Sequence, residues 1–277
     1  MPDTIETFGQ SILQHGSLND RVYLIKLHAD DLPRILDHID ELAAQHSYSK
    51  LFAKIPARHK DLFILRGYQR EAFVPGFFAG SEDAEFLCRY LDPARLADPV
   101  APRCREVLAV AEEKRVRGKG DPEKAPTIEL AKGEHAEELA AVYAEVFPSY
   151  PFPIHDPGYL RETMESHVRY FLVRNEGRVV AVSSSEMDRA ARNVEMTDFA
   201  TLPSERGKSL ALYLLEHMER EMRALGMRTA YTIARALSAG MNVTFARMGY
   251  LFGGQLVNNT NISGQIESMN VWYKDLG

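Results

Sequence analysis

The chain has 277 residues, of which 45% are hydrophobic and 26% charged, with a net charge of −6. This composition is typical of a soluble globular protein, and the length suffices for two modest domains or one large one. The negative charge argues against general nucleic-acid binding, and no apolar run approaches the roughly 18 residues that span a membrane. The first twenty residues lack a basic start and an apolar core, so we expect a cytoplasmic protein with two reduced cysteines.

The first 110 residues predict an α+β unit. In chain order, the patterns indicate a helix, a strand, a second helix and two strands (31–46, 51–55, a helical run ending at 66–68, 71–78 and 85–91). Residues 112–126 are charged and contain Gly and Pro, which predicts a linker, with the frayed end of a helix from Arg103 as the alternative. We expect an N-terminal domain over 1–112, a linker over 113–126 and a second domain over 127–277.

After the linker, strand and helix patterns alternate. The expected elements are a strand (127–131), a helix (134–147), a Pro-rich loop (148–157), a helix (157–167), a hairpin (169–174 and 178–187), a strand (192–202), a helix (210–225), a strand (229–234), a short helix (239–248) and two strands (250–257 and 265–274). The hairpin is predicted from Asn175-Glu-Gly177 between two β-rich runs. The long helix is predicted from apolar residues at helical spacing.

The stretch from Leu202 to Ala211 joins an expected strand to an expected helix. The first N–H groups of a helix have no partner within it, and the helix dipole favours negative charge there. Gly207 allows a ligand to approach closely, while Arg206 and Lys208 add positive charge. The stretch predicts a site for a phosphorylated ligand, the alternative being a solvated basic turn. A nucleotide-triphosphatase P-loop is excluded because Leu202 stands where its first Gly would be.

This stretch resembles the acetyl-coenzyme A pyrophosphate loop of the GNAT acyltransferases, although Ser209 replaces the usual central Gly. The element order from residue 127 is also that of the GNAT fold, a mixed α/β fold. The resemblance implies acetyl-coenzyme A as cosubstrate, with its pantetheine arm along a splayed strand and its pyrophosphate on the loop. The implied binding residues are Ala200, Thr201, Leu202, Arg206, Gly207, Lys208, Ser209, Leu210 and Ala211. No His or Cys cluster has metal-ligand spacing, so we expect no metal.

An amine acceptor must lose a proton before it attacks a thioester. With a pKa near 10.4, only about one amine in 2,500 is neutral at pH 7, so a general base is needed. Glu195 and Asp198 lie on the strand before the loop, and a straight strand would put them on opposite faces. We favour Glu195 as the base, with Asp198 second; both could instead be solvated strand carboxylates.

The leaving thiolate needs less help because a thiol pKa is near 8.5. Many GNAT proteins have a Tyr where this chain has Phe245. Tyr213, Tyr231 or water could therefore supply the proton. Neither cysteine lies near the motif, which favours direct attack within a ternary complex.

A narrower resemblance comes from the C-terminal residues 238–250 and 258–274 and from residues 48–51 and 66–72, which look like those of β-lysine N-acetyltransferases. It implies transfer of acetyl to the terminal (ε) amine of β-lysine, giving the compatible solute N-ε-acetyl-β-lysine. The candidate acceptor-binding residues are Tyr150 and Phe152 in the Pro-rich loop and Asn258, Asn259 and Glu267 in the polar C-terminal run. The alternatives are another small amine or a peptide amine as acceptor, or a non-catalytic acyl-coenzyme A sensor. A homodimer is possible.

The N-terminal half also resembles part of the C-terminal half. Its order of helix, strand, helix and two strands matches that of 210–274, and Leu36-Asp37-His38 resembles Leu215-Glu216-His217. We hypothesise a degenerate half-copy of the GNAT fold that has no counterpart of the pyrophosphate loop. The alternative is an unrelated α+β cap.

Overall fold

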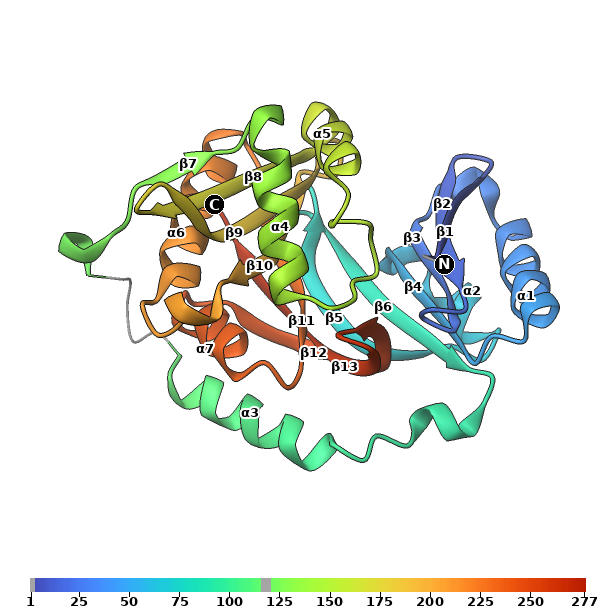
Figure 1. The fold of residues 1–277 in the computed structure, drawn as a ribbon. Helices are drawn as coiled ribbons and strands as arrows, with labels where there is room; N and C mark the ends of the chain where they lie inside the picture. Colours follow the sequence, from blue (N-terminus) through green and yellow to red (C-terminus); the bar gives the residue numbers. More distant parts are fainter. Residues whose placement is uncertain (1–2, 116–120) are drawn as a thin grey trace.

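The computed structural model describes residues 3–115 and 121–277, so part of the expected linker (116–120) lies outside the described residues. The described strands form one mixed sheet in the order β1-β2-β3-β4-β6-β5-β12-β13-β11-β10-β9-β8-β7 (Figure 1). The strands are β1 (Thr4–Phe8), β2 (Ser11–Gly16), β3 (Arg21–Lys26), β4 (Lys50–Pro56), β5 (Gln69–Phe78), β6 (Glu82–Tyr90), β7 (Ile128–Leu130), β8 (Val168–Asn175), β9 (Arg178–Asp188), β10 (Asn193–Thr201), β11 (Thr229–Arg235), β12 (Leu251–Ile262) and β13 (Gln265–Asp275).

The α-helices cover the two faces of this sheet. They are α1 (Arg34–His46), α2 (Lys60–Ile64), α3 (Ala101–Glu113), α4 (Ala136–Val146), α5 (Pro157–Ser166), α6 (Leu210–Ala224) and α7 (Ala239–Arg247). The expected elements are present, but the sequence analysis missed β1, β2 and β3. Residues 112 and 113 form the end of α3. This agrees with the alternative to a linker there, the end of a helix from Arg103.

The two halves of the chain share the sheet through β5 and β12, which meet at Ala72 and Gly254. A Cβ at Gly254 would overlap the main chain of β5 at Glu71, so this approach requires glycine. A buried ion pair of the N-terminal half reaches across the same junction through one hydrogen bond: the Lys50 Nζ lies 2.9 Å from Glu71 and donates to the Val257 carbonyl of β12 at 2.7 Å. Figure 1 shows this junction at the centre of the molecule, with α3 running below it from one half to the other.

Strand alternation gives β3 and β4 two different faces. Val22 and Leu24 of β3 are fully buried and belong to a core that contains Ile35 and Ile39 of α1. The alternate side chains, those of Arg21 and Tyr23, point to the other face, as successive residues of a strand do. That second face lines a cavity described below.

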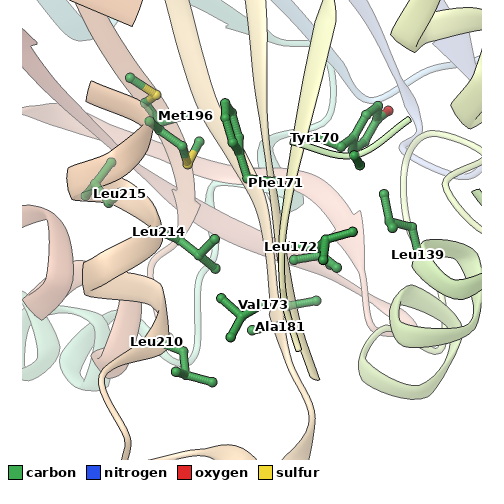
Figure 2. Close-up of a cluster of buried hydrophobic side chains, with 14 of the residues drawn as sticks. Leu139, Tyr170, Phe171, Leu172, Val173, Ala181, Met196, Leu210, Leu214 and Leu215 are labelled. Carbon is green, nitrogen blue, oxygen red and sulfur yellow. The ribbon is translucent and has the colours of Figure 1, made fainter. Parts of the chain in front are cut away.

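The larger core lies in the C-terminal half, where β8 is buried on both faces. Figure 2 shows Leu210, Leu214 and Leu215 of α6 on one side of the sheet and Leu139 of α4 on the other. Phe171 and Val173 of β8 point toward α6, while Tyr170 and Leu172 point toward α4 (Figure 2). Strands covered by helices on both faces are expected to be apolar, as β8 is over residues 170–173.

Strands β10 and β11 are parallel but separate soon after they meet. Their pairing covers only Asn193–Glu195 and Thr229–Tyr231. Strand β10 stays paired with β9 as far as Thr201, with a bulge between Thr197 and Ala200. The splayed strand that the GNAT resemblance implied is therefore present, and Glu195 lies where the two strands part.

The strand order repeats between the halves. The series β1-β2-β3-β4-β6-β5 has the same connectivity as β8-β9-β10-β11-β13-β12, and a helix joins the parallel pair in each (α1 and α6). This agreement extends the predicted half-copy to the three strands before α1. The common origin of the halves stays a prediction, which a superposition of their Cα atoms would test.

Candidate active site

A cavity of about 980 Å³ lies between the two halves. The C-terminal half lines it with β10, the loop between α4 and α5, the turn before α6, and α7. The N-terminal half adds side chains from β3 and β4, among them Arg21, Tyr23, Phe52 and Lys54. Sequence analysis missed this contribution; the alternation of Arg-Val-Tyr-Leu-Ile-Lys over 21–26 was the available signal.

The predicted pyrophosphate loop opens onto this cavity. Six of the nine predicted cofactor residues line it, namely Thr201, Arg206, Gly207, Ser209, Leu210 and Ala211. The main-chain N–H groups from Gly207 to Ala211 donate to no acceptor within the described residues. Gly207 and Ser209 have φ values of 83° and 59°, which turn the chain into the first turn of α6. A row of free N–H groups at a helix N-terminus suits a diphosphate.

Three predicted cofactor residues do not line the cavity. The side chains of Ala200 and Leu202 are buried in the core of the C-terminal half, which leaves only their main chain for a ligand. Lys208 is exposed, and its Nζ pairs with Glu205 at 2.7 Å. The positive charge that the sequence placed on the loop is thus partly neutralised by its neighbour.

Glu195 lines the cavity at the point where β10 and β11 separate. Burial raises the pKa of Glu195 to about 7, and the negative charge of Glu186, its cross-strand partner on β9, acts in the same direction. The positive charge of Lys54 and a hydrogen bond with Tyr231 oppose the rise. A carboxyl group with a pKa near 7 is suited to accept a proton at neutral pH.

Asp198 lines the same cavity, contrary to the expectation that it faces away from Glu195. The bulge in β10 inserts one extra residue, with Asp198 at φ 52°, and this reverses the alternation of side chains. The Asp198 carboxylate accepts hydrogen bonds from the Tyr150 and Ser184 hydroxyls, each at 2.5 Å. Burial raises the pKa of Asp198, and those two hydrogen bonds counteract it. With both oxygens already engaged, Asp198 holds the loop residue Tyr150 in place.

Lys54 and Tyr231 connect the N-terminal half to Glu195. The Lys54 Nζ donates to the Tyr231 hydroxyl at 2.8 Å. Although burial alone would lower it, the pKa of Lys54 is raised by Tyr23, Glu195 and other nearby acidic groups, so Lys54 stays charged. Burial and then the charge of Glu195 raise the pKa of Tyr231 well above its usual range, so its hydroxyl stays protonated.

The two tyrosines considered as proton donors in place of Phe245 are engaged elsewhere. Phe245 lines the cavity and packs edge-on against Phe199 and Tyr250. The Tyr213 hydroxyl donates instead to the Asp121 carbonyl at 3.1 Å. Neither Tyr213 nor Tyr231 is among the residues that line the cavity.

The predicted acceptor-binding residues divide into two groups. Tyr150, Phe152 and Asn259 line the cavity. Asn258 and Glu267 do not: the Asn258 amide donates to the carbonyls of Arg95 and Ala97, and Glu267 is buried in a two-hydrogen-bond pair with Arg235. Their contacts support the chain beside the site, so the polar run contributes only in part.

Across the described ranges 3–115 and 121–277, no group of three or more His, Cys, Asp or Glu side chains is placed to hold a metal ion. Cys88 and Cys104 are buried and unpaired. None of the helices that the structure describes combines the length and the apolar character needed to cross a membrane.

Comparison with known proteins agrees with this geometry. The acetyltransferase (GNAT) family profile matches residues 136–250. The chain is 39% identical over 272 residues to a β-lysine N(6)-acetyltransferase of Methanococcus maripaludis, covering 98% of both chains. It is 33% identical over 256 residues to one of Methanosarcina mazei (85% of this chain, 94% of the other) and 27% identical over 266 residues to the N-acetyltransferase YodP of Bacillus subtilis (96% of each).

These similarities extend through the N-terminal half as well as the half that contains the pyrophosphate loop. GNAT acetyltransferases use acetyl-coenzyme A, which the free N–H groups of the loop and the splayed strand are suited to bind. The chain therefore belongs to the GNAT family of acetyltransferases.

Proposed function

We propose that the chain transfers the acetyl group of acetyl-coenzyme A to the terminal (ε) amine of β-lysine, giving N-ε-acetyl-β-lysine. The observation that carries this proposal is the 39% identity, over 98% of both chains, to a protein described as a β-lysine N(6)-acetyltransferase. A second relative with the same description, at 33% identity, supports it. The cavity, lined by both halves of the chain, is consistent with an acceptor of small-molecule size.

In the proposed reaction the acceptor nitrogen attacks the thioester carbonyl carbon. A C–N bond forms, the C–S bond breaks, and the proton lost by the amine passes to Glu195. The thiolate leaves and is protonated by water, since Phe245 occupies the position of a potential donor. With its pKa near 7, Glu195 can accept the proton and return it to solvent within a turnover. Asp198 and Tyr150 position the wall of the acceptor site.

Two other functions are compatible with the site. Another small amine would suit the same cavity, and a non-catalytic sensor is favoured by two departures from the family pattern, Ser209 in the loop and Phe245 near the thiol. A peptide amine is disfavoured because side chains of β3 and β4 add a further wall to the cavity.

One experiment separates these functions. The full chain is incubated with acetyl-coenzyme A and each of β-lysine, α-lysine and a set of polyamines, and the released thiol is counted. Release with β-lysine well above the others supports the proposal, and faster release with another amine would replace it. Binding of acetyl-coenzyme A without release for any amine would favour the sensor.

We also propose a cellular role and a location for the reaction. Acetylation removes one positive charge and leaves the product a neutral zwitterion, a property suited to a compatible solute in osmoadaptation. We place this activity in the cytoplasm, where acetyl-coenzyme A is available. A homodimer is a further part of the proposal, and sedimentation of the purified chain would test it.

A further inference from the structure

Arg21 is a buried cation in the wall of the cavity. Arg21 is the first residue of β3, and it is 4% exposed. One terminal nitrogen donates to the carbonyl oxygen of Asn259 and to the Thr260 hydroxyl at 3.2 Å, and the other reaches the Gln14 side chain at 3.5 Å. The Nε donor is buried without a partner. Every acceptor that Arg21 meets is therefore neutral.

The charge of Arg21 has no counterion in contact. No carboxylate oxygen of the described residues lies within 4.0 Å of its guanidinium. Arg235, another arginine of the cavity wall, is neutralised by Glu267 at 2.6 Å. Burial lowers the pKa of Arg21 to about 10, so the group remains a cation at neutral pH. A buried charge whose neighbours are neutral acceptors and the rings of Tyr23 and Phe52 is costly, and an anion in the cavity would relieve that cost.

Asn259 presents a matching group beside Arg21. It is 1% exposed and lines the cavity, and its side-chain oxygen is buried without a donor. Because Arg21 donates to the main-chain oxygen of the same residue, the two unsatisfied groups are neighbours. One is a cationic donor and the other a neutral acceptor. That combination complements the carboxylate and the neighbouring ammonium of an amino acid.

The position of this pair relative to Glu195 fits one acceptor bound at both ends. Arg21 and Tyr23 lie on the same face of β3, about 7 Å apart along the strand. Arg21, Tyr23 and Glu195 all line the cavity, and Tyr23 is near enough to both of the others to interact with them electrostatically. A diamino acid held at Arg21 by its carboxylate can therefore direct its far amine toward Glu195.

We propose that Arg21 binds the carboxylate of the acceptor, with Asn259 accepting a hydrogen bond from the adjacent amino group. The N-terminal half thereby selects diamino acids over polyamines. This inference rests on the proposed function for the identity of the acceptor, and it assigns Arg21 as a specificity-determining residue.

The test compares β-lysine with its primary amide, which keeps both amines and nearly the same shape but has no negative charge. For the wild-type chain we expect kcat/KM to be about 100-fold higher for the acid, because a hydrogen-bonded pair with a charged partner is lost in the amide. Arg21→Met should reduce this ratio to within threefold of one, mainly through loss on the acid. Arg21→Lys, which keeps the charge, should restore part of the ratio.

Arg95→Met is the matched control. Arg95 is also a buried arginine, but it pairs with Asp20 at 3.1 Å and lies outside the cavity wall. We expect its loss to leave the acid-to-amide ratio unchanged whatever it does to overall yield. A wild-type ratio below three overturns the inference without any variant. So does an Arg21→Met chain that loses activity equally on both acceptors, since a purely structural role predicts that result.

Failure of the proposed function and failure of the Arg21 carboxylate site give different results. If the wild-type chain releases no thiol with β-lysine, that function fails, and the comparison passes to α-lysine against cadaverine, its decarboxylated counterpart. A preference for the acid that disappears in Arg21→Met still supports the carboxylate site. Equal use of the two amines overturns it.

Discussion

The most direct consequence of the site concerns Glu195→Gln, which removes the proposed base while keeping its size. With a pKa of about 7, Glu195 is half ionised at pH 7 and about nine-tenths ionised at pH 8. Only the ionised form accepts a proton, so wild-type kcat/KM should rise through pH 7 and then level off. At pH 6 it should be roughly a tenth of its plateau value.

The variant must rely on amine that is already neutral. Loss of a general base costs about 10²- to 10⁴-fold, so we expect a deficit in that range at pH 7. Because the free amine increases tenfold per pH unit below its pKa of about 10.4, the variant should gain about 100-fold between pH 7 and pH 9. The wild type only doubles over that interval. The deficit should therefore shrink by about 50-fold.

The assay is initial thiol release under subsaturating acceptor, from pH 5.5 to pH 9.5, with the affinity for acetyl-coenzyme A measured in parallel as a control for folding. The affinity should not change, because Glu195 does not belong to the pyrophosphate loop. A variant whose profile runs parallel to that of the wild type, with a constant deficit, would refute the assignment of Glu195 as the base.

Further predictions concern the surroundings of this group and the scaffold. Glu186→Gln should move the acid limb of the rate profile to lower pH by roughly one unit, and Lys54→Met should move it to higher pH, since the two charges act oppositely. Gly207→Val should weaken acetyl-coenzyme A binding about 5- to 30-fold in calorimetric titration, because φ is 83° there. Gly254→Ala should lower the free energy of unfolding by about 1–3 kcal/mol in denaturant titrations, whereas Gly240→Ala, with open space around it, should not.

The chemistry of the C-terminal half was accessible from sequence because it depends on local patterns. The turn at Arg206–Ala211 follows from a strand, a loop and a helix in succession, whereas the choice of Glu195 as the base came from the resemblance to GNAT proteins and stays a prediction. The prediction that Asp198 faces away from Glu195 was wrong because one inserted residue in β10 reverses the alternation of side chains between the two faces. No residue type in 192–202 marks that bulge. Only the pairing with β9 determines it.

The contribution of the N-terminal half was not accessible in the same way. Arg21 and Lys54 reach the cavity because β5 pairs with β12, about 180 residues further along the chain. Pairing at that separation leaves no periodic signal in either strand. For Asn258, the sequence predicted a ligand contact where the structure has an internal one. Its polar neighbourhood suggested a ligand site, yet its amide is engaged by the carbonyls of Arg95 and Ala97.

The junction of β5 and β12 affects whether the C-terminal half can be produced without the N-terminal half. The strands left at the two ends of the described sheet are β1 and β7, which are short and hence poor templates for aggregation. Truncation to residues 127–277 would remove the pairing of Gly254 with Ala72 and expose Leu256, Met269 and Val271, which pack against apolar side chains of β5 and β6. Such a fragment should precipitate rather than work as a smaller enzyme, and even a solubilised one would have an acceptor pocket without its far wall.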